Sequence, residues 1–91
     1  MSYQYATERA EVFTESGQLM YVAIRDNAIR MLKLSGAVTC GKLTNAIGVS
    51  GSSWTMLACV DRLAELGEIV LVPRPGYATQ DQVYVRGSLP L

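Results

Sequence analysis

The stretch that decides the fold is residues 39–67, TCGKLTNAIGVSGSSWTMLACVDRLAELG. It holds two runs in which apolar residues recur every three or four positions, with a short Gly-Val-Ser segment between the runs. This spacing places the apolar side chains on one face of a helix. Thr39 is a residue type that caps helix N-termini, and Gly67 is typical of a helix C-terminus. We therefore predict two consecutive helices, over 39–47 and 52–66.

The segments on either side continue the pattern. From 18 to 34 apolar residues again step by threes and fours, while charged residues lie on another face, which predicts a longer amphipathic helix. Downstream, 68–73 and 82–86 are rich in β-branched residues, and Arg74-Pro75-Gly76 opens the connection between them. This arrangement predicts a β-hairpin with a long tip. The expected fold class is α+β, mainly α, with three helices followed by a hairpin.

The two ends of the chain lack a clear period. Residues 1–17 mix Tyr, Val and Phe with Glu and Ser, and they end at Ser16-Gly17, which reads as a break. We expect either a short helix or a loose arm here, and this acidic segment is a candidate dimerisation element. Residues 88–91 are expected to be a frayed tail. Residues 18–87 then form one compact domain, as a chain of this length favours.

The charge of the chain is balanced but unevenly distributed. Eight Lys and Arg oppose eight Asp and Glu, and the pI is about 6.1, so composition alone does not indicate a nucleic-acid ligand. The middle of the chain differs, since residues 18–60 carry four basic residues and one acid, an excess of three positive charges (4 − 1). These five residues are Arg25, Asp26, Arg30, Lys33 and Lys42.

The residue types needed for catalysis or metal binding are scarce. The chain has no histidine, and its two cysteines, Cys40 and Cys59, do not form a CxxC pair. The carboxylates are scattered over charged faces, so no pair is predicted to share a cleft. We expect neither an enzyme nor a metal site, no cofactor, and two reduced, unbridged thiols. The polar N-terminus and the lack of a long apolar run predict a cytoplasmic protein without a membrane contact.

Three segments resemble the winged helix-turn-helix domain of prokaryotic transcription regulators. They are AIRML (28–32), TCGKLTNAIGVS (39–50) and VDRLAELGEI (60–69), and the stretch VLVPRPGYATQDQVYV (70–85) would be the wing. The resemblance implies a three-helix winged helix with a C-terminal β-hairpin wing. It also implies sequence-specific binding of double-stranded DNA, with the helix over 52–66 in the major groove and the wing against the backbone.

The residues expected to contact DNA follow from this resemblance. Two lie on the second helix, four at the start of the third, and two in the wing: Lys42, Asn45, Ser52, Ser53, Trp54, Thr55, Arg74 and Tyr77. Lys42 and Arg74 would neutralise phosphates, Asn45 could donate to one, and the hydroxyl groups could bond phosphates or base edges. For Ser52, capping of the third helix is an equal alternative. A homodimer is expected, because pairing doubles the phosphate contacts of so small a domain.

The expected outer face of the third helix favours a different function. It carries an aromatic residue, two acids and no Arg, Lys, Asn or Gln to read bases: Trp54, Leu57, Ala58, Asp61 and Glu65. Such a face is typical of a protein interface, so the alternative is a winged-helix protein-interaction module that does not bind DNA. Helical spacing also predicts a Trp54 that is at least partly exposed, unless the N-terminal segment packs over it.

Overall fold

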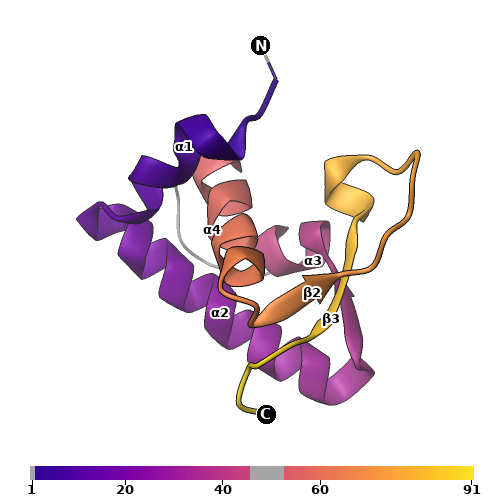
Figure 1. The fold of residues 1–91 in the computed structure, drawn as a ribbon. Helices are drawn as coiled ribbons and strands as arrows, with labels where there is room; N and C mark the ends of the chain where they lie inside the picture. The colour runs from indigo at the N-terminus through magenta and orange to yellow at the C-terminus, as the bar shows by residue number, and fades with distance from the viewer. Residues whose placement is uncertain (1, 46–52) are drawn as a thin grey trace.

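The computed structural model describes residues 2–45 and 53–91 and has an α+β, mainly helical fold (Figure 1). Its helices pack together on one side, and a small antiparallel sheet with a long loop lies on the other. The elements in chain order are α1 (Tyr5–Val12), α2 (Glu15–Ser35), β1 (Ala37–Thr39), α3 (Cys40–Asn45), α4 (Ser53–Glu65), β2 (Ile69–Leu71), the 3₁₀ helix η1 (Thr79–Asp81) and β3 (Val83–Arg86).

The long helix α2 begins earlier than the sequence predicts. Its N-cap is Thr14, whose hydroxyl oxygen accepts a hydrogen bond from the backbone N–H of Gly17 at 3.1 Å. The break predicted at Ser16-Gly17 is therefore wrong, since both residues lie in the first turn of α2. A Cβ atom at Gly17 would lie 1.9 Å from the carbonyl oxygen of Glu11, so this glycine permits the tight connection between α1 and α2.

The N-terminal segment forms the short helix α1 and packs on the rest of the molecule. Val12 is fully buried in the common core, and Tyr3 and Tyr5 pack partly against it. α1 lies against α4 and α2, so it extends the helical layer (Figure 1). Of the two expectations for this segment, the helix is the one that the structure shows.

Helices α3 and α4 lie where the sequence places them within the described residues. The side-chain oxygen of Thr39 accepts a hydrogen bond from the backbone N–H of Lys42 at 3.2 Å, which confirms its predicted capping role. α4 ends at Glu65, and Gly67 follows with a φ of 75°, a left-handed conformation that suits glycine. The predicted helical positions 46, 47 and 52 lie outside the described residues.

The predicted hairpin is present, and a third strand joins it. β3 pairs antiparallel with β2 and also with β1, so the strand order is β1-β3-β2. Tyr84 lies opposite both Val38 and Leu71, and Val38 and Tyr84 are buried beneath the helices. β1 has only three residues and no alternating pattern of its own, so pairing with β3 is what makes it a strand.

The core joins every layer and includes both thiols. Its largest fully buried side chains include Ile24, Leu43, Leu63 and Ile69, from α2, α3, α4 and β2. Cys40 and Cys59 are buried and free, and burial raises the pKa of each thiol to about 11. The prediction that the two cysteines are not bridged is confirmed.

The C-terminal tail is held against the rest of the molecule up to Leu89, and so it is not frayed there. The backbone N–H groups of Ser88 and Leu89 donate to the carbonyl oxygens of Gly67 and Glu68 at 2.9 and 3.2 Å. These hydrogen bonds place the side chain of Leu89 in the core, where it is fully buried. The expectation of a loose tail was wrong because a single apolar residue between Ser88 and Pro90 has no period that marks it as core.

Candidate nucleic-acid interface

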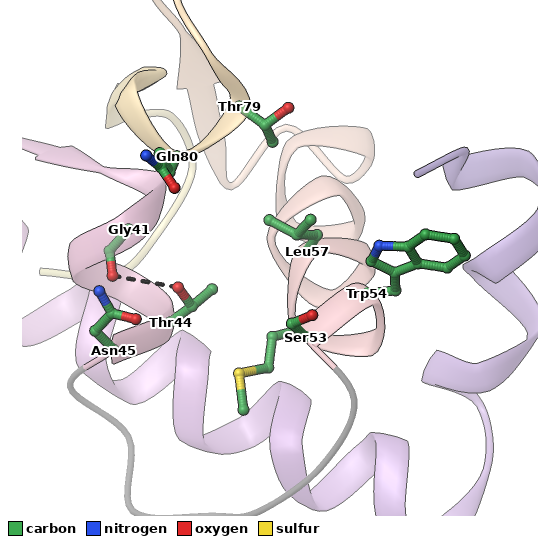
Figure 2. Close-up of a pocket in the computed structure, with 9 residues that line it drawn as sticks. Gly41, Thr44, Asn45, Ser53, Trp54, Leu57, Thr79 and Gln80 are labelled. Carbon is green, nitrogen blue, oxygen red and sulfur yellow. Dashed lines mark hydrogen bonds between the residues drawn. The ribbon is translucent and has the colours of Figure 1, made fainter. Parts of the chain in front are cut away.

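A groove lies between α3, the first half of α4 and η1 (Figure 2). Its volume is about 310 Å³. Figure 2 shows Gly41, Thr44, Asn45 and Gln80 on one side of it, and Ser53 and Leu57 on the other. The full lining is Gly41, Thr44, Asn45, Ser53, Trp54, Met56, Leu57, Thr79 and Gln80. The groove thus joins polar side chains from two elements to an apolar patch of α4.

Gly41 allows α3 and η1 to lie close together at the groove. A Cβ atom at Gly41 would lie 3.2 Å from the carbonyl oxygen of Gln80, so a larger residue would push η1 away from α3. Thr44 turns its hydroxyl back onto its own helix, where it hydrogen bonds to the carbonyl oxygens of Cys40 and Gly41 at 3.2 Å each (Figure 2). Asn45 follows Gly41 by about one turn and lies on the same face of α3.

A second depression of about 330 Å³ adjoins the groove and contains Lys42. The two share Gly41, Asn45 and Gln80, so they form one continuous concave surface. Lys42 is exposed, and within residues 2–45 and 53–91 it makes no ion pair, although Asp81 lines the same depression. Its ammonium group is therefore available to an external anion.

The tip of the loop between β2 and β3 carries the next pair of candidate residues. The guanidinium of Arg74 lies 3.8 Å from the centre of the Tyr77 ring, a cation–π contact that orders a long side chain. Gly76 between them has a φ of 89°, which residues with a side chain rarely adopt. Tyr77 is half exposed, and Arg74 forms no ion pair with a carboxylate of the described chain. This pair presents a positive charge at an exposed tip.

The structure brings together some of the eight predicted DNA-contacting residues. Asn45, Ser53 and Trp54 line the groove, and Lys42 lines the adjoining depression. Thr55 lines neither, although it is partly exposed on α4. The remaining three fall elsewhere: Arg74 and Tyr77 contact each other at the loop tip, and Ser52 lies outside the described residues.

The face of α4 that was predicted to be exposed is covered in part. Ala58 is fully buried. The carboxylate of Asp61 accepts a hydrogen bond from the hydroxyl of Tyr3 at 2.6 Å, and that of Glu65 accepts one from Tyr5 at 2.9 Å. This part of the prediction was wrong because it treated α4 without α1, which packs over that side of the helix.

The acids at the C-terminal end of α4 and just after it are paired within the chain. Glu65 forms ion pairs with Arg9 at 3.1 Å and with Arg62 at 2.6 Å, and the hydrogen bond from Arg62 is the main cause of a lowered pKa of Glu65. Glu68 pairs with Arg25 of α2 at 3.1 Å. Burial raises the pKa of Asp61, and the hydrogen bond from Tyr3 opposes that rise only in part. The negative charge of this region is thus directed toward α1 and α2.

Trp54 has the partial exposure that helical spacing predicts. It belongs to the lining of the groove, but Figure 2 shows its indole directed away from Asn45, Gln80 and Leu57. Its side chain is therefore at the margin of the groove and not at the centre.

Sequence reasoning missed the contribution of η1. Thr79 and Gln80 line the groove, yet they lie in a stretch that was predicted only as the long tip of a hairpin. The available signal was the polar run Thr-Gln-Asp-Gln at 79–82, which has no apolar residue to fix it as a core element. Gly41 was likewise not singled out, because its role depends on the approach of η1.

Other kinds of site find no support in the part of the chain that the structure describes. Within residues 2–45 and 53–91, no three Cys, Asp or Glu side chains gather in a way that could hold a metal ion. No helix in those ranges combines the length and the apolar character that crossing a membrane requires. Comparison with known proteins adds no assignment, because no family model, curated protein or solved structure matches the chain.

Proposed function

We propose that this chain is a winged-helix domain that binds double-stranded DNA as a sequence-specific transcription regulator. In this proposal helices α2, α3 and α4 correspond to the three helices of the winged-helix fold, and the β2–β3 hairpin corresponds to its wing. The likeness of the sequence to winged-helix regulators supports the same conclusion. The proposal places α4 in the major groove by its first turns, with the wing beside it.

One observation carries the proposal: the polar groups suited to DNA share a concave surface from which the acids of α4 are turned away. Lys42, Asn45 and Ser53 line that surface. Asp61 and Glu65 are bonded to residues of the N-terminal segment. The sequence argument against DNA was that the outer face of α4 carries an aromatic residue and two acids but no base-reading side chain. The internal partners of the two acids reduce their repulsion of phosphates.

The charges give each element a distinct task in this proposal. Lys42 on α3 and Arg74 at the wing tip would each neutralise a phosphate, one on either side of α4. Ser53, at the first turn of α4, would hydrogen bond a phosphate or a base edge. With two such cations in each chain, a dimer would be needed for substantial affinity at physiological salt.

A salt titration tests the proposal directly. The full chain is titrated against a fluorescent duplex of random sequence at several salt concentrations between about 20 and 200 mM. Binding should weaken linearly on a log–log plot, with a slope near −0.9 for each phosphate contacted. Absence of binding at the lowest salt concentration would refute the proposal.

Two lysine variants provide a matched comparison. Lys42→Ala should reduce the magnitude of the slope by about 0.9 for each DNA-bound chain, because one phosphate contact is lost. Lys33→Ala removes the same charge from an exposed position of α2 that lines neither depression, and it should leave the slope unchanged. Equal effects of the two substitutions would show that the concave surface is not the DNA-binding site.

A specific observation also favours a protein interface elsewhere on the molecule. Phe13, Leu19 and Val22 are apolar side chains with exposed fractions of 49%, 67% and 52%. They lie around the α1–α2 corner, which Figure 1 shows at the opposite side of the molecule from the β2–β3 loop. Exposed apolar side chains at this corner, away from the residues that line the concave surface, suit association of two copies while both concave surfaces remain open to DNA.

The homodimer has its own test. Sedimentation equilibrium should give a mass near twice that of the chain, and replacing both Leu19 and Val22 with Ser should shift it toward the monomer. Both side chains are exposed, so folding should be retained, as far-ultraviolet circular dichroism would show. If Phe13, Leu19 and Val22 instead bind a different protein, the wild-type chain should sediment as a monomer.

A further inference from the structure

Apart from Gln4 near the N-terminus, the primary amide side chains of residues 2–45 and 53–91 fall into two groups. Gln18, Asn27 and Gln82 each donate to a backbone carbonyl oxygen, at 2.6, 3.2 and 3.4 Å. The side chains of Asn45 and Gln80 are exposed, and their amide groups make no hydrogen bond with any described residue. These two come from elements far apart in the chain, yet both line the same groove. Their donors and acceptors are therefore free for an external partner.

Local geometry holds the two amides on one wall of the groove. Gly41 lies on the face of α3 that also carries Asn45, and it makes the closest approach to Gln80. Figure 2 shows Gly41, Asn45 and Gln80 along the same side. The Cβ of an alanine at Gly41 would lie 3.2 Å from the Gln80 carbonyl oxygen, so the contact between α3 and η1 is already tight.

Beyond Ser53, the opposite wall of the groove is apolar. Leu57 of α4 faces the amide side across the groove (Figure 2). The one basic side chain of α4, Arg62, is held by Glu65 at 2.6 Å. α4 therefore offers the groove a methyl-rich surface and no bidentate donor, and the polar recognition comes from α3 and η1.

Resting on the proposed DNA binding, we propose that Asn45 and Gln80 read the adenine edge of an A·T base pair while Leu57 contacts the thymine methyl group. In the major groove adenine presents the N7 acceptor beside the N6 amino donor. Each primary amide carries both a donor and an acceptor, so one of the two side chains donates to N7 while the other accepts from N6. Thymine presents a methyl group on the same edge of the pair. One wall of the protein groove therefore offers amides to the adenine, and the other offers the apolar side chain of Leu57 to the thymine methyl group.

Selection from a randomised duplex library tests the proposal. The wild-type chain should enrich at least one A·T position. Asn45→Ala and Gln80→Ala should each lower discrimination at that position on the order of tenfold, while affinity for random duplex and its salt slope stay unchanged. Gln4→Ala is the matched control, because Gln4 is an exposed glutamine that lines neither depression and should leave discrimination intact.

Modified bases separate the two halves of the contact. Replacing the selected adenine with 7-deazaadenine removes the N7 acceptor. This change should weaken DNA binding by the wild-type chain but not by the variant that lacks the amide donating to N7. Replacing the thymine with uracil removes one methyl group and should weaken binding about fourfold. Wild-type binding that is insensitive to both replacements would contradict the assignment.

The failure of this inference can be told apart from the failure of the proposed function. If the wild-type chain binds and selects a sequence, but Asn45→Ala and Gln80→Ala discriminate as well as it does, the amide assignment is wrong and DNA binding stands. If the wild-type chain binds no duplex at low salt, both proposals are overturned. Enrichment of G·C positions alone would likewise exclude reading by these amides.

Discussion

Replacing Leu89 with Ala tests the most unexpected feature of the fold, a core residue in the last three positions of the chain. Leu89 is fully buried, and truncation of a buried leucine destabilises proteins by about 2–5 kcal/mol. Leu89 lies outside the helices and strands, so the backbone around it can relax into the space that is left, and the lower part of that range applies, about 2.5 kcal/mol. A chain of this length has a total stability of about 5–14 kcal/mol, so the variant should remain folded.

Thermal unfolding followed by circular dichroism measures the effect. In a domain of this size each kcal/mol shifts Tm by about 4–8 °C, so Leu89→Ala should lower Tm by about 10–20 °C. Urea titration should show a lower midpoint with an unchanged m-value, since the surface exposed on unfolding barely changes.

Leu91→Ala is the matched control, since it removes the same atoms two residues further along the tail. Leu91 is 38% exposed and outside the buried cluster, so its truncation should change stability by less than about 1 kcal/mol. If Leu89→Ala and Leu91→Ala unfold at the same temperature, the tail does not contribute to the core and the reasoning fails.

Three further predictions concern the wing, α4 and the thiols. Arg74→Ala should weaken binding about equally for all duplex sequences and flatten the salt slope by roughly 0.9, and an unchanged slope would remove Arg74 from the interface. Because burial raises the pKa of Asp61, the folded chain holds this proton to higher pH than the unfolded chain does, and the contribution of Asp61 to stability falls as pH rises through that window. Asp61→Asn should remove this fall, which unfolding curves between about pH 4 and 7 would reveal, and identical pH dependence in the two proteins would argue against it. Cys40 and Cys59 should react with a thiol reagent only as the chain unfolds, and a reductant should leave Tm unaltered, because both thiols are buried, free and raised to a pKa of about 11.

Part of the candidate site could be read from residue type alone. Lys42 and Asn45 stand on a predicted helix at positions that the structure places on the concave surface. The Arg74-Pro75-Gly76 sequence likewise indicated an exposed turn, because Pro fixes its own φ and Gly permits a positive φ. Gln80 could not be found this way, since its place in the groove depends on the contact between η1 and α3.

The sequence by itself determined the elements whose signals are local. The cores of α2, α3 and α4 follow from apolar residues at helical spacing, and the left-handed ends at Gly36 and Gly67 follow from the absence of a Cβ atom. The hairpin follows from its β-branched strands in the same way. Such features depend only on residues within a few positions along the chain, so the sequence alone is enough to predict them.

Only the tertiary structure decided what depends on distant partners. β1 exists because β3 lies beside it, and Leu89 is buried because the tail hydrogen bonds to the turn after α4. The acids of α4 are held by Tyr3 and Tyr5, nearly sixty positions away in the sequence. Strand pairing and burial of this kind depend on which surfaces meet after folding. The local spacing of apolar residues in the sequence does not determine which surfaces those are.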